Sequence, residues 1–471
     1  MASNQNPNDN SDGDIAPSMP QWRSVQVGSR QPQLVPQAAS VPKSAPGNDD
    51  VIDKASFFRA REPEVEKQNK PKCPWVCPNL RPVPAFYPLE KSSRFVDDDT
   101  DTVTERLAEC LRVLSVQAVF NNEAASAYLM TSEGVEMHLS LWKTTGEKSG
   151  IVVELQRRKG DSIAFHRYSR YILDAAIGDF DVTQHLATQG VDMDLVYSKK
   201  VQRLLNVELQ GKSKDTEHEN AVIAIEIAHG LLMKDRMDAR QLGLESLCLL
   251  TDPKKTGITT ALIASHVVLL GTARGIQGLS KGADLGDDII FDEAPFQGIR
   301  EAILSLVQFS RIGEDVEFEN EEEDAETMGA LHNLALAVLA NALDVVENQD
   351  RFDDNPEETE KKPSAIKTAP CSEIAGAFLD ESGEISKAEI MKTLISELGK
   401  ASKKPHNACL SARCIGSLCR ASDKAKRRAK ELGAKNVVST ALDVGVRTHL
   451  KLETECNKVT KVLQAPTRED N

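Results

Sequence analysis

Apolar residues recur at intervals of three and four along most of the chain after about Asp192, and no segment there alternates apolar and polar positions. This spacing is typical of helices that bury one face. Most of the apolar runs are bounded by Gly, Pro or Asp, residues that start or stop helices. The pattern predicts helices over 192–207, 219–234, 239–251, 257–271, 296–311, 327–346, 387–400, 406–421, 424–432, 435–443 and 446–463.

Two parts of this helical region repeat a short pattern. Residues 239–252 (ARQLGLESLCLLTD) and 412–423 (ARCIGSLCRASD) share a Ser-Leu-Cys core, end in Asp and lead into a lysine-bearing segment. At the C-terminal end, residues 423–445 predict a short helix, a break at Gly433 and a second helix, before a long third helix. This order is similar to an armadillo repeat, and residues 254–270 offer a less complete copy.

The resemblance implies a short, irregular armadillo-like α-α superhelix over residues 192–463, in which each unit buries its apolar face on its neighbours. An ordinary helical bundle is the alternative. Armadillo proteins that recognise basic localisation signals use ladders of Trp and Asn. The three tryptophans of this chain, Trp22, Trp75 and Trp142, lie outside the helical region, so we do not expect importin-like recognition.

Residues 101–178 follow a different pattern and predict a compact α+β module. Helical spacing over 101–116 comes first, with Asp101 or Thr102 as the cap, and short β-like runs follow at 127–131, 136–143 and 151–158. After Gly160 a second helix is expected, with Asp161 or Ser162 as its cap. The order predicts a helix, three or four antiparallel strands and a helix.

The last predicted strand and the helix after it each divide into an apolar and a polar side. In the strand, Ile151, Val153 and Leu155 are expected on the buried face, and Val152, Glu154 and Gln156 on a largely solvated one. The helix carries an apolar stripe formed by Phe165, Tyr168, Ile172 and Ala175. On its other side, Arg170 and Asp174 stand at pairing distance.

The run Val153-Glu154-Leu155-Gln156-Arg157, the turn Gly160-Asp161-Ser162 and the aromatic Phe165 resemble the kinase-associated C-terminal domain of the AMP-activated protein kinase family. In that family the module binds anionic phospholipids through basic residues or packs against other subunits. The first 100 residues could not hold a kinase domain, and no glycine-rich loop or catalytic-loop pattern occurs elsewhere. The resemblance therefore implies the fold of this module more than an activity.

Residues 1–100 are rich in Asn, Asp, Ser, Gln and Pro, and we expect them to form a disordered, Pro-rich arm. Within the arm, residues 72–91 (KCPWVCPNLRPVPAFYPLEK) are either a simple linker or an extended segment that docks on a partner or on the protein's own domains. Cys73 and Cys77 have no further Cys or His near enough in sequence to complete a zinc site, so no metal is expected.

Charge divides the helical region further. Residues 195–345 hold 14 Lys or Arg and 25 Asp or Glu, whereas residues 386–463 hold 17 and 7. We expect armadillo-like helices over 192–346 with a disordered acidic insert at 313–326, an acidic linker at 347–372, and basic C-terminal helices over 373–463. The basic run 424–430 is either a solvated helix face or a contact for the acidic insert or for another anionic partner.

Motifs that would indicate chemistry are weak. Residues 378–394 resemble half an EF-hand, but the first ligand position falls on Phe378, so a helix capped by Ser386 and Glu389 is the better interpretation. HExxH, GxSxG and phosphate-loop patterns do not occur, and His138, His229, His266 and His332 sit among apolar neighbours as core histidines do. No catalytic residue, metal ligand or cofactor is predicted.

The sequence thus predicts a non-catalytic scaffold or adaptor that binds a protein partner. The alternatives are a peripheral adaptor that binds anionic lipid and a regulatory subunit of a kinase complex; nucleic acid is disfavoured and the oligomeric state is open. No N-terminal apolar segment or full-length apolar span occurs, which favours the cytoplasm, with the nucleus as the alternative. The candidate binding residues are Arg157, Arg158, Lys159, Arg167, Arg170, Lys424, Lys426, Arg427, Arg428 and Lys430.

Overall fold

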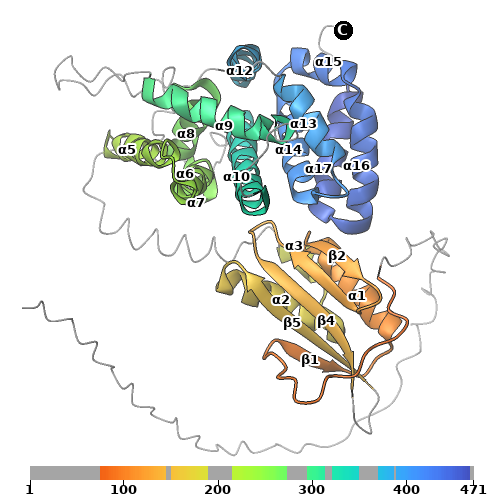
Figure 1. The fold of residues 1–471 in the computed structure, drawn as a ribbon. Helices are drawn as coiled ribbons and strands as arrows, with labels where there is room; N and C mark the ends of the chain where they lie inside the picture. Colours follow the sequence, from red (N-terminus) through yellow and green to blue (C-terminus); the bar gives the residue numbers. More distant parts are fainter. Residues whose placement is uncertain are drawn as a thin grey trace, which may run out of the picture. The chain divides into compact units, whose positions relative to one another are not determined.

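The computed structural model describes residues 75–144, 150–188, 215–272, 294–312, 321–349, 370–386 and 389–466. The chain divides into units 1–68 and 69–471, and every described residue belongs to the second unit. The described residues are mainly helical, with 15 helices and one five-stranded antiparallel sheet (Figure 1). The expectation of a mainly α chain with a small antiparallel sheet is confirmed, whereas the helix predicted at 192–207 lies outside the described residues.

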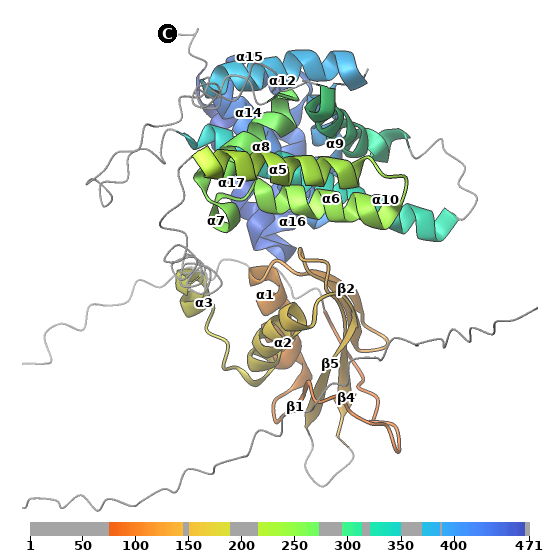
Figure 2. The ribbon, with the colours of Figure 1, turned by 90° about the vertical axis from the view of Figure 1, so that its left-hand side faces the viewer.

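The α+β module is built on a sheet in the order β1-β5-β4-β3-β2. Its strands are β1 (Ser93–Val96), β2 (Gln117–Asn121), β3 (Ser126–Met130), β4 (Glu136–Lys143) and β5 (Ile151–Lys159). Helices α1 (Thr100–Val113) and α2 (Ser162–Ile177) cover one face of this sheet (Figure 2), and the short α3 (Val182–Thr188) follows. Side chains from the helices and from the covered face of the sheet form one apolar core.

Local sequence explains how the two long helices of the module begin. The side chain of Asp99 accepts a hydrogen bond from the backbone of Thr102, so α1 starts slightly before the predicted cap. Asp161 caps α2 as predicted, because its carboxylate accepts the backbone N–H of Ala164 at 2.7 Å. Gly160 precedes it with φ 97°, and a Cβ there would lie 2.7 Å from the carbonyl oxygen of Gly134, so only glycine fits this turn.

The segment before α1 belongs to the module, so the predicted disordered arm ends too late. The side chain of Trp75 is 0% exposed and stacks on Phe120 with ring centroids 5.1 Å apart. The strand β1 pairs with β5 as an antiparallel edge strand. The prediction was wrong for 75–100 because these contacts join residues far apart in sequence, which a count of local apolar residues does not detect. Residues 1–74 lie outside the described part of the chain.

The same segment covers the second face of the sheet, which was expected to be solvated. Glu154 is 0% exposed and accepts hydrogen bonds from the Tyr87 hydroxyl (3.0 Å), the Glu90 backbone N–H (2.9 Å) and the Trp142 indole (3.3 Å). Burial and the neighbouring carboxylate of Glu154 raise the pKa of Tyr87. The expected exposure of Val152 and Glu154 was therefore wrong, and for Glu154 the cause is the contact of Tyr87 and Glu90, from the segment before β1, with this face.

The remaining helices follow one another along the chain. They are α5 (Asp215–Leu232), α6 (Met237–Leu250), α7 (Pro253–Thr256), α8 (Ile258–Leu270), α9 (Ala294–Ile312), α10 (Glu321–Glu347), α12 (Cys371–Ser386), α13 (Ile390–Gly399), α14 (Pro405–Ala421), α15 (Asp423–Glu431), α16 (Ala434–Thr448) and α17 (Leu450–Gln464). All of them except α7 contribute side chains to one continuous apolar core. The helix α12 was not predicted, and it makes Ser386 a C-terminal residue of one helix instead of the cap of the next. Helix α13 begins after Glu389, which makes no side-chain capping bond.

The acidic segments also differ from the prediction at their edges. Helix α10 begins at Glu321, so the second part of the expected disordered insert at 313–326 is helical. Helix α12 begins at Cys371, within the expected linker at 347–372. The rest of both acidic runs, 313–320 and 350–369, lies outside the described residues.

Helices distant in sequence pack side by side. Helix α6 packs on α10, α10 on α14 and α14 on α17, while α5 packs on α8, α13 on α16 and α12 on α15. Side chains join successive members of the first series: Arg413 pairs with Asp344 at 3.3 Å, and Arg420 pairs with Glu347. We call α6, α10, α14 and α17 the helix ladder.

Helix α10 lies within this ladder. Among the described residues it contains the one helical segment, Glu326–Glu347, that is long and apolar enough to cross a membrane by length and composition. Its apolar window is 61% buried inside the protein, against α6, α8, α9 and α14. The segment therefore has the character of a core helix.

Polar contacts join the module to the C-terminal helices. The backbone N–H of Lys451 donates to the Ser115 hydroxyl at 2.9 Å, and Arg112 pairs with Glu453 at 3.2 Å. The half-buried imidazole of His406 lies 3.1 Å from the carbonyl oxygen of Met130. Through these contacts α17 packs against the end of α1, and α14 packs against the end of β3.

Candidate functional site

Most of the basic residues predicted on the module are bonded to other groups of the chain. Arg157 donates to the carbonyl oxygen of Gly160 at 2.8 Å, and Lys159 pairs with Glu326 of α10 at 2.6 Å. Arg167 pairs with Glu133 at 2.5 Å.

The two remaining module residues differ in their surroundings. Arg170 is paired with Asp174 at 3.7 Å, as the helical spacing predicted, and its side chain is 82% exposed. Burial, followed by the nearby charge of Arg158, lowers the pKa of His138. Four of the five cations predicted on this surface are therefore already bonded within the chain, and Arg158 makes no hydrogen bond or ion pair to the described residues.

On α15, most of the predicted cations are also paired. Lys424 forms an ion pair with Asp380 of α12, and Arg428 pairs with Glu389 and Glu431. These two carboxylates raise the pKa of the Arg428 guanidinium.

Lys426 has a structural partner of another kind. Its side chain is 4% exposed, and its ammonium donates to the carbonyl oxygens of Ala465 at 2.6 Å and Pro466 at 3.2 Å. It therefore neutralises the C-terminal end of α17, where helix carbonyls lack partners within the helix. Arg427 is exposed on the same helix.

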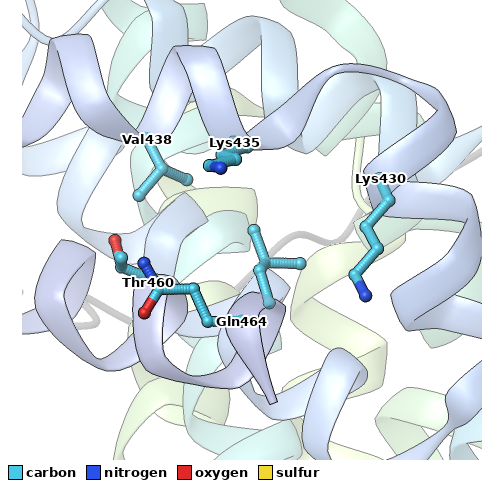
Figure 3. A pocket seen from close by; sticks show the side chains of 6 residues that line it. Lys430, Lys435, Val438, Thr460 and Gln464 are labelled. Carbon is cyan, nitrogen blue, oxygen red and sulfur yellow. The ribbon is translucent and has the colours of Figure 1, made fainter. Parts of the chain in front are cut away.

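The last predicted residue, Lys430, lines a pocket with a second lysine that the sequence analysis did not select. This pocket, which we call the dilysine pocket, has a volume of about 430 Å³ and is lined by Lys430, Lys435, Val438, Thr460, Leu463 and Gln464 (Figure 3). It lies between the end of α15, the first turns of α16 and the last turns of α17. No local pattern in the sequence marks Lys435 as a neighbour of Thr460 or Gln464.

The lining combines cationic groups with an apolar floor. Val438 is 1% exposed and Leu463 is 6% exposed, whereas Lys430, Lys435 and Gln464 are exposed around them. The hydroxyl of Thr460 donates to the Cys456 carbonyl oxygen at 2.8 Å, so its oxygen is left as an acceptor. The lining contains no Asp or Glu. Such a pocket suits an anionic group that is joined to an apolar one.

Other reactive side chains have buried, structural surroundings. Among the described residues, no group of three His, Cys, Asp or Glu side chains could hold a metal ion. Burial raises the pKa of the thiols of Cys409, Cys414 and Cys419 to about 12, so they stay protonated at neutral pH and are poor nucleophiles. Burial lowers the pKa of His266 to about 4. Phe378, which falls on the first calcium-ligand position of the half EF-hand, is 1% exposed in the helical core.

No protein-family model and no curated protein matches the chain. Among solved structures, it is similar to the crystal structure of an engineered protein from the Northeast Structural Genomics Consortium. That similarity covers 51% of this chain and 96% of the other, at 12% identity and a TM-score of 0.20, which is too low to support an argument.

Proposed function

We propose that the protein is a non-catalytic scaffold or adaptor, and that its helices form an armadillo-like superhelix that presents a surface to a protein partner. The observation that carries this proposal is the repetition of one arrangement. Helix α7, Gly257 and α8 follow one another as α15, Gly433 and α16 do, with a short helix, a glycine at positive φ (83° and 75°) and a longer helix. The ψ angles of the two glycines differ, at 165° and 22°.

The shared Ser-Leu-Cys pattern falls at matching places in this arrangement. Leu247 lies near the end of α6, directly before α7, and Leu418 lies near the end of α14, directly before α15. Both side chains are 0% exposed. Helices α6 and α14 are also alternate members of the helix ladder, and their packing supports a repeating unit. Stacks of this kind expose one extended surface along equivalent helices, which supports a binding role.

The ladder offers apolar side chains to solvent at one end. Leu242 and Leu249 of α6 are 52% and 53% exposed, and Ile223 and Ile227 of the neighbouring α5 are 46% and 61% exposed. Exposed large aliphatic side chains on neighbouring helices are consistent with a protein-binding surface.

The test compares partner capture by three forms of the full chain. The double variant Leu242→Asp/Leu249→Asp places charges on exposed positions, so the fold should persist. Ile163→Asp changes a side chain of α2 that is 79% exposed and serves as the matched control. We expect partners captured by the wild type, and identified by mass spectrometry, to be lost from the double variant and retained by Ile163→Asp. Equal recovery with all three would contradict a binding role for this end of the ladder.

For the module we propose a relation to the kinase-associated C-terminal domain. The order of helix, antiparallel strands and helix, with both helices on one face of the sheet, supports this. Binding of anionic lipid through Arg157, Lys159 and Arg167 would require these cations to leave their present partners. A sedimentation assay of the full chain with phosphatidylserine vesicles tests the lipid alternative, and loss of sedimentation in Arg158→Ala/Arg170→Ala would support it.

A further inference from the structure

The cations of the C-terminal basic region divide into bonded and available groups. Lys424 and Arg428 are neutralised by carboxylates, and Lys426 is buried against backbone carbonyls. Lys430 and Lys435 form no ion pair with the described residues, and both line the dilysine pocket. These two lysines therefore bring positive charge that no described carboxylate neutralises to the lining of the pocket.

We infer that the dilysine pocket is a docking site for an acidic peptide segment, in which a carboxylate lies beside an aliphatic side chain. The inference rests on the proposed adaptor role and names the chemistry of one partner segment. The two ammonium groups would each donate a charge-assisted hydrogen bond to the carboxylate. The aliphatic side chain would cover Val438 and Leu463, whose burial leaves a small apolar floor under the lysines.

Charge complementarity decides the class of ligand. The lining has no acidic residue, so a carboxylate meets no repulsion from the lining. It also has no aromatic side chain, so bases of a nucleic acid have no surface on which to stack. A membrane surface attracts a protein through several cations together. The ion pairs of Lys424 and Arg428 neutralise two of the cations that such a surface would use.

The size of the site agrees with this class. A volume of about 430 Å³ lies within the range of sites that hold small ligands or a few side chains. The pocket is formed by three helices, so its walls are set by helix packing. A short peptide can therefore bind without rearrangement of the lining.

The test measures fluorescence polarisation of a labelled peptide, Glu-Glu-Leu-Leu-Asp-Glu, with the full chain. A matched peptide replaces Glu by Gln and Asp by Asn. We expect the wild type to bind the acidic peptide at least about tenfold more tightly than the neutral peptide. The affinity for the acidic peptide should fall as the salt concentration rises from about 0.1 to about 0.5 M.

Two variants locate the site. Lys430→Ala/Lys435→Ala should weaken binding of the acidic peptide about tenfold or more, because it removes both donors. Lys461→Ala removes an exposed lysine of α17 that does not line the pocket, and it should bind like the wild type. All substituted side chains are exposed, and circular dichroism checks that each variant is folded.

Three results would overturn the inference. One is equal affinity for the acidic and neutral peptides, and another is equal loss of affinity in Lys430→Ala/Lys435→Ala and Lys461→Ala. The third is binding to phosphatidylserine vesicles, with no peptide binding, that depends on Lys430 and Lys435. None of them repeats the capture experiment with Leu242→Asp/Leu249→Asp. Failure of this site and failure of the adaptor proposal are therefore separate outcomes.

Discussion

Acidification should destabilise the protein through one pair of histidines, the buried His449 and the half-buried His406. The backbone N–H of Leu452 points at Nδ1 of His449 at 3.1 Å, and Nε2 of His449 lies 3.0 Å from Nδ1 of His406. Because the amide can only donate, Nδ1 of His449 must accept and its Nε2 must carry the proton. His406 then accepts at Nδ1 and donates from Nε2 to the carbonyl oxygen of Met130. A single assignment of protons satisfies all three hydrogen bonds, and both rings are neutral in it.

An additional proton on either ring would find no acceptor among these hydrogen-bonded groups. On His406 it would face the N–H of His449, and on His449 it would face the N–H of Leu452. Burial is the first cause that lowers the pKa of both rings, and for His449 the proximity of His406 and then of Lys451 lowers it further, to about 3. Lys451 also lowers the pKa of His406, whereas the bond to Met130 opposes this. The charged groups at this junction include Arg112, which is paired with Glu453.

The sign and size of the effect follow from His449. Its ordinary pKa is 6.5, so below that pH the unfolded chain binds a proton that the folded chain refuses. The free energy of unfolding therefore falls as the pH drops below about 6.5 and continues to fall towards pH 3. Between pH 7 and pH 5 the loss from this ring is about 2 kcal/mol. The lowered pKa of His406 acts in the same direction.

The assay is urea unfolding of the full chain at both pH values, followed by far-UV circular dichroism. His449→Gln removes the titrating ring, so its loss of stability between pH 7 and pH 5 should be smaller than that of the wild type by about 2 kcal/mol. His166→Gln changes an exposed histidine of α2 and should keep the wild-type dependence. Identical losses in the wild type and His449→Gln would refute the argument, as would ring ¹⁵N shifts that show His449 charged at pH 5.

Two further predictions concern packing. Gly243→Ala should lower the free energy of unfolding by about 1 to 3 kcal/mol, because the new Cβ would lie 2.8 Å from a backbone nitrogen of α5. Gly230→Ala places its Cβ in open space and should be neutral or stabilising. Equal urea midpoints of unfolding for the two variants would contradict this prediction. Trp75→Ala should lower the free energy of unfolding by about 3 to 5 kcal/mol and speed proteolysis of the segment before β1, because the indole is fully buried. A loss below about 1 kcal/mol would show that this segment is not part of the core.

Local periodicity explains which parts of the fold the sequence predicts. The apolar stripe of α2 and the apolar spacing of the ladder helices can each be recognised within the sequence of a single helix. The cap at Asp161 is equally local, because it directly precedes α2. The burial of Trp75 and of Glu154 depends on partners 45 and 67 positions away, Phe120 and Tyr87 respectively. A polar residue that alternates with apolar ones is expected on a wet face, and the expectation fails when a distant segment covers that face.

The same limit applies to charge at the candidate site. The basic run at 424–430 predicts a cationic helix, and α15 is one, yet a run of charges does not reveal which of them is already paired. Asp380 and Glu389 precede the run by about forty residues, and they neutralise Lys424 and Arg428 only because α12 and α13 pack beside α15. Of the run, Lys430 lines the pocket, where it is joined by Lys435 of α16. Two lysines at one pocket favour a short acidic ligand over a broad anionic surface.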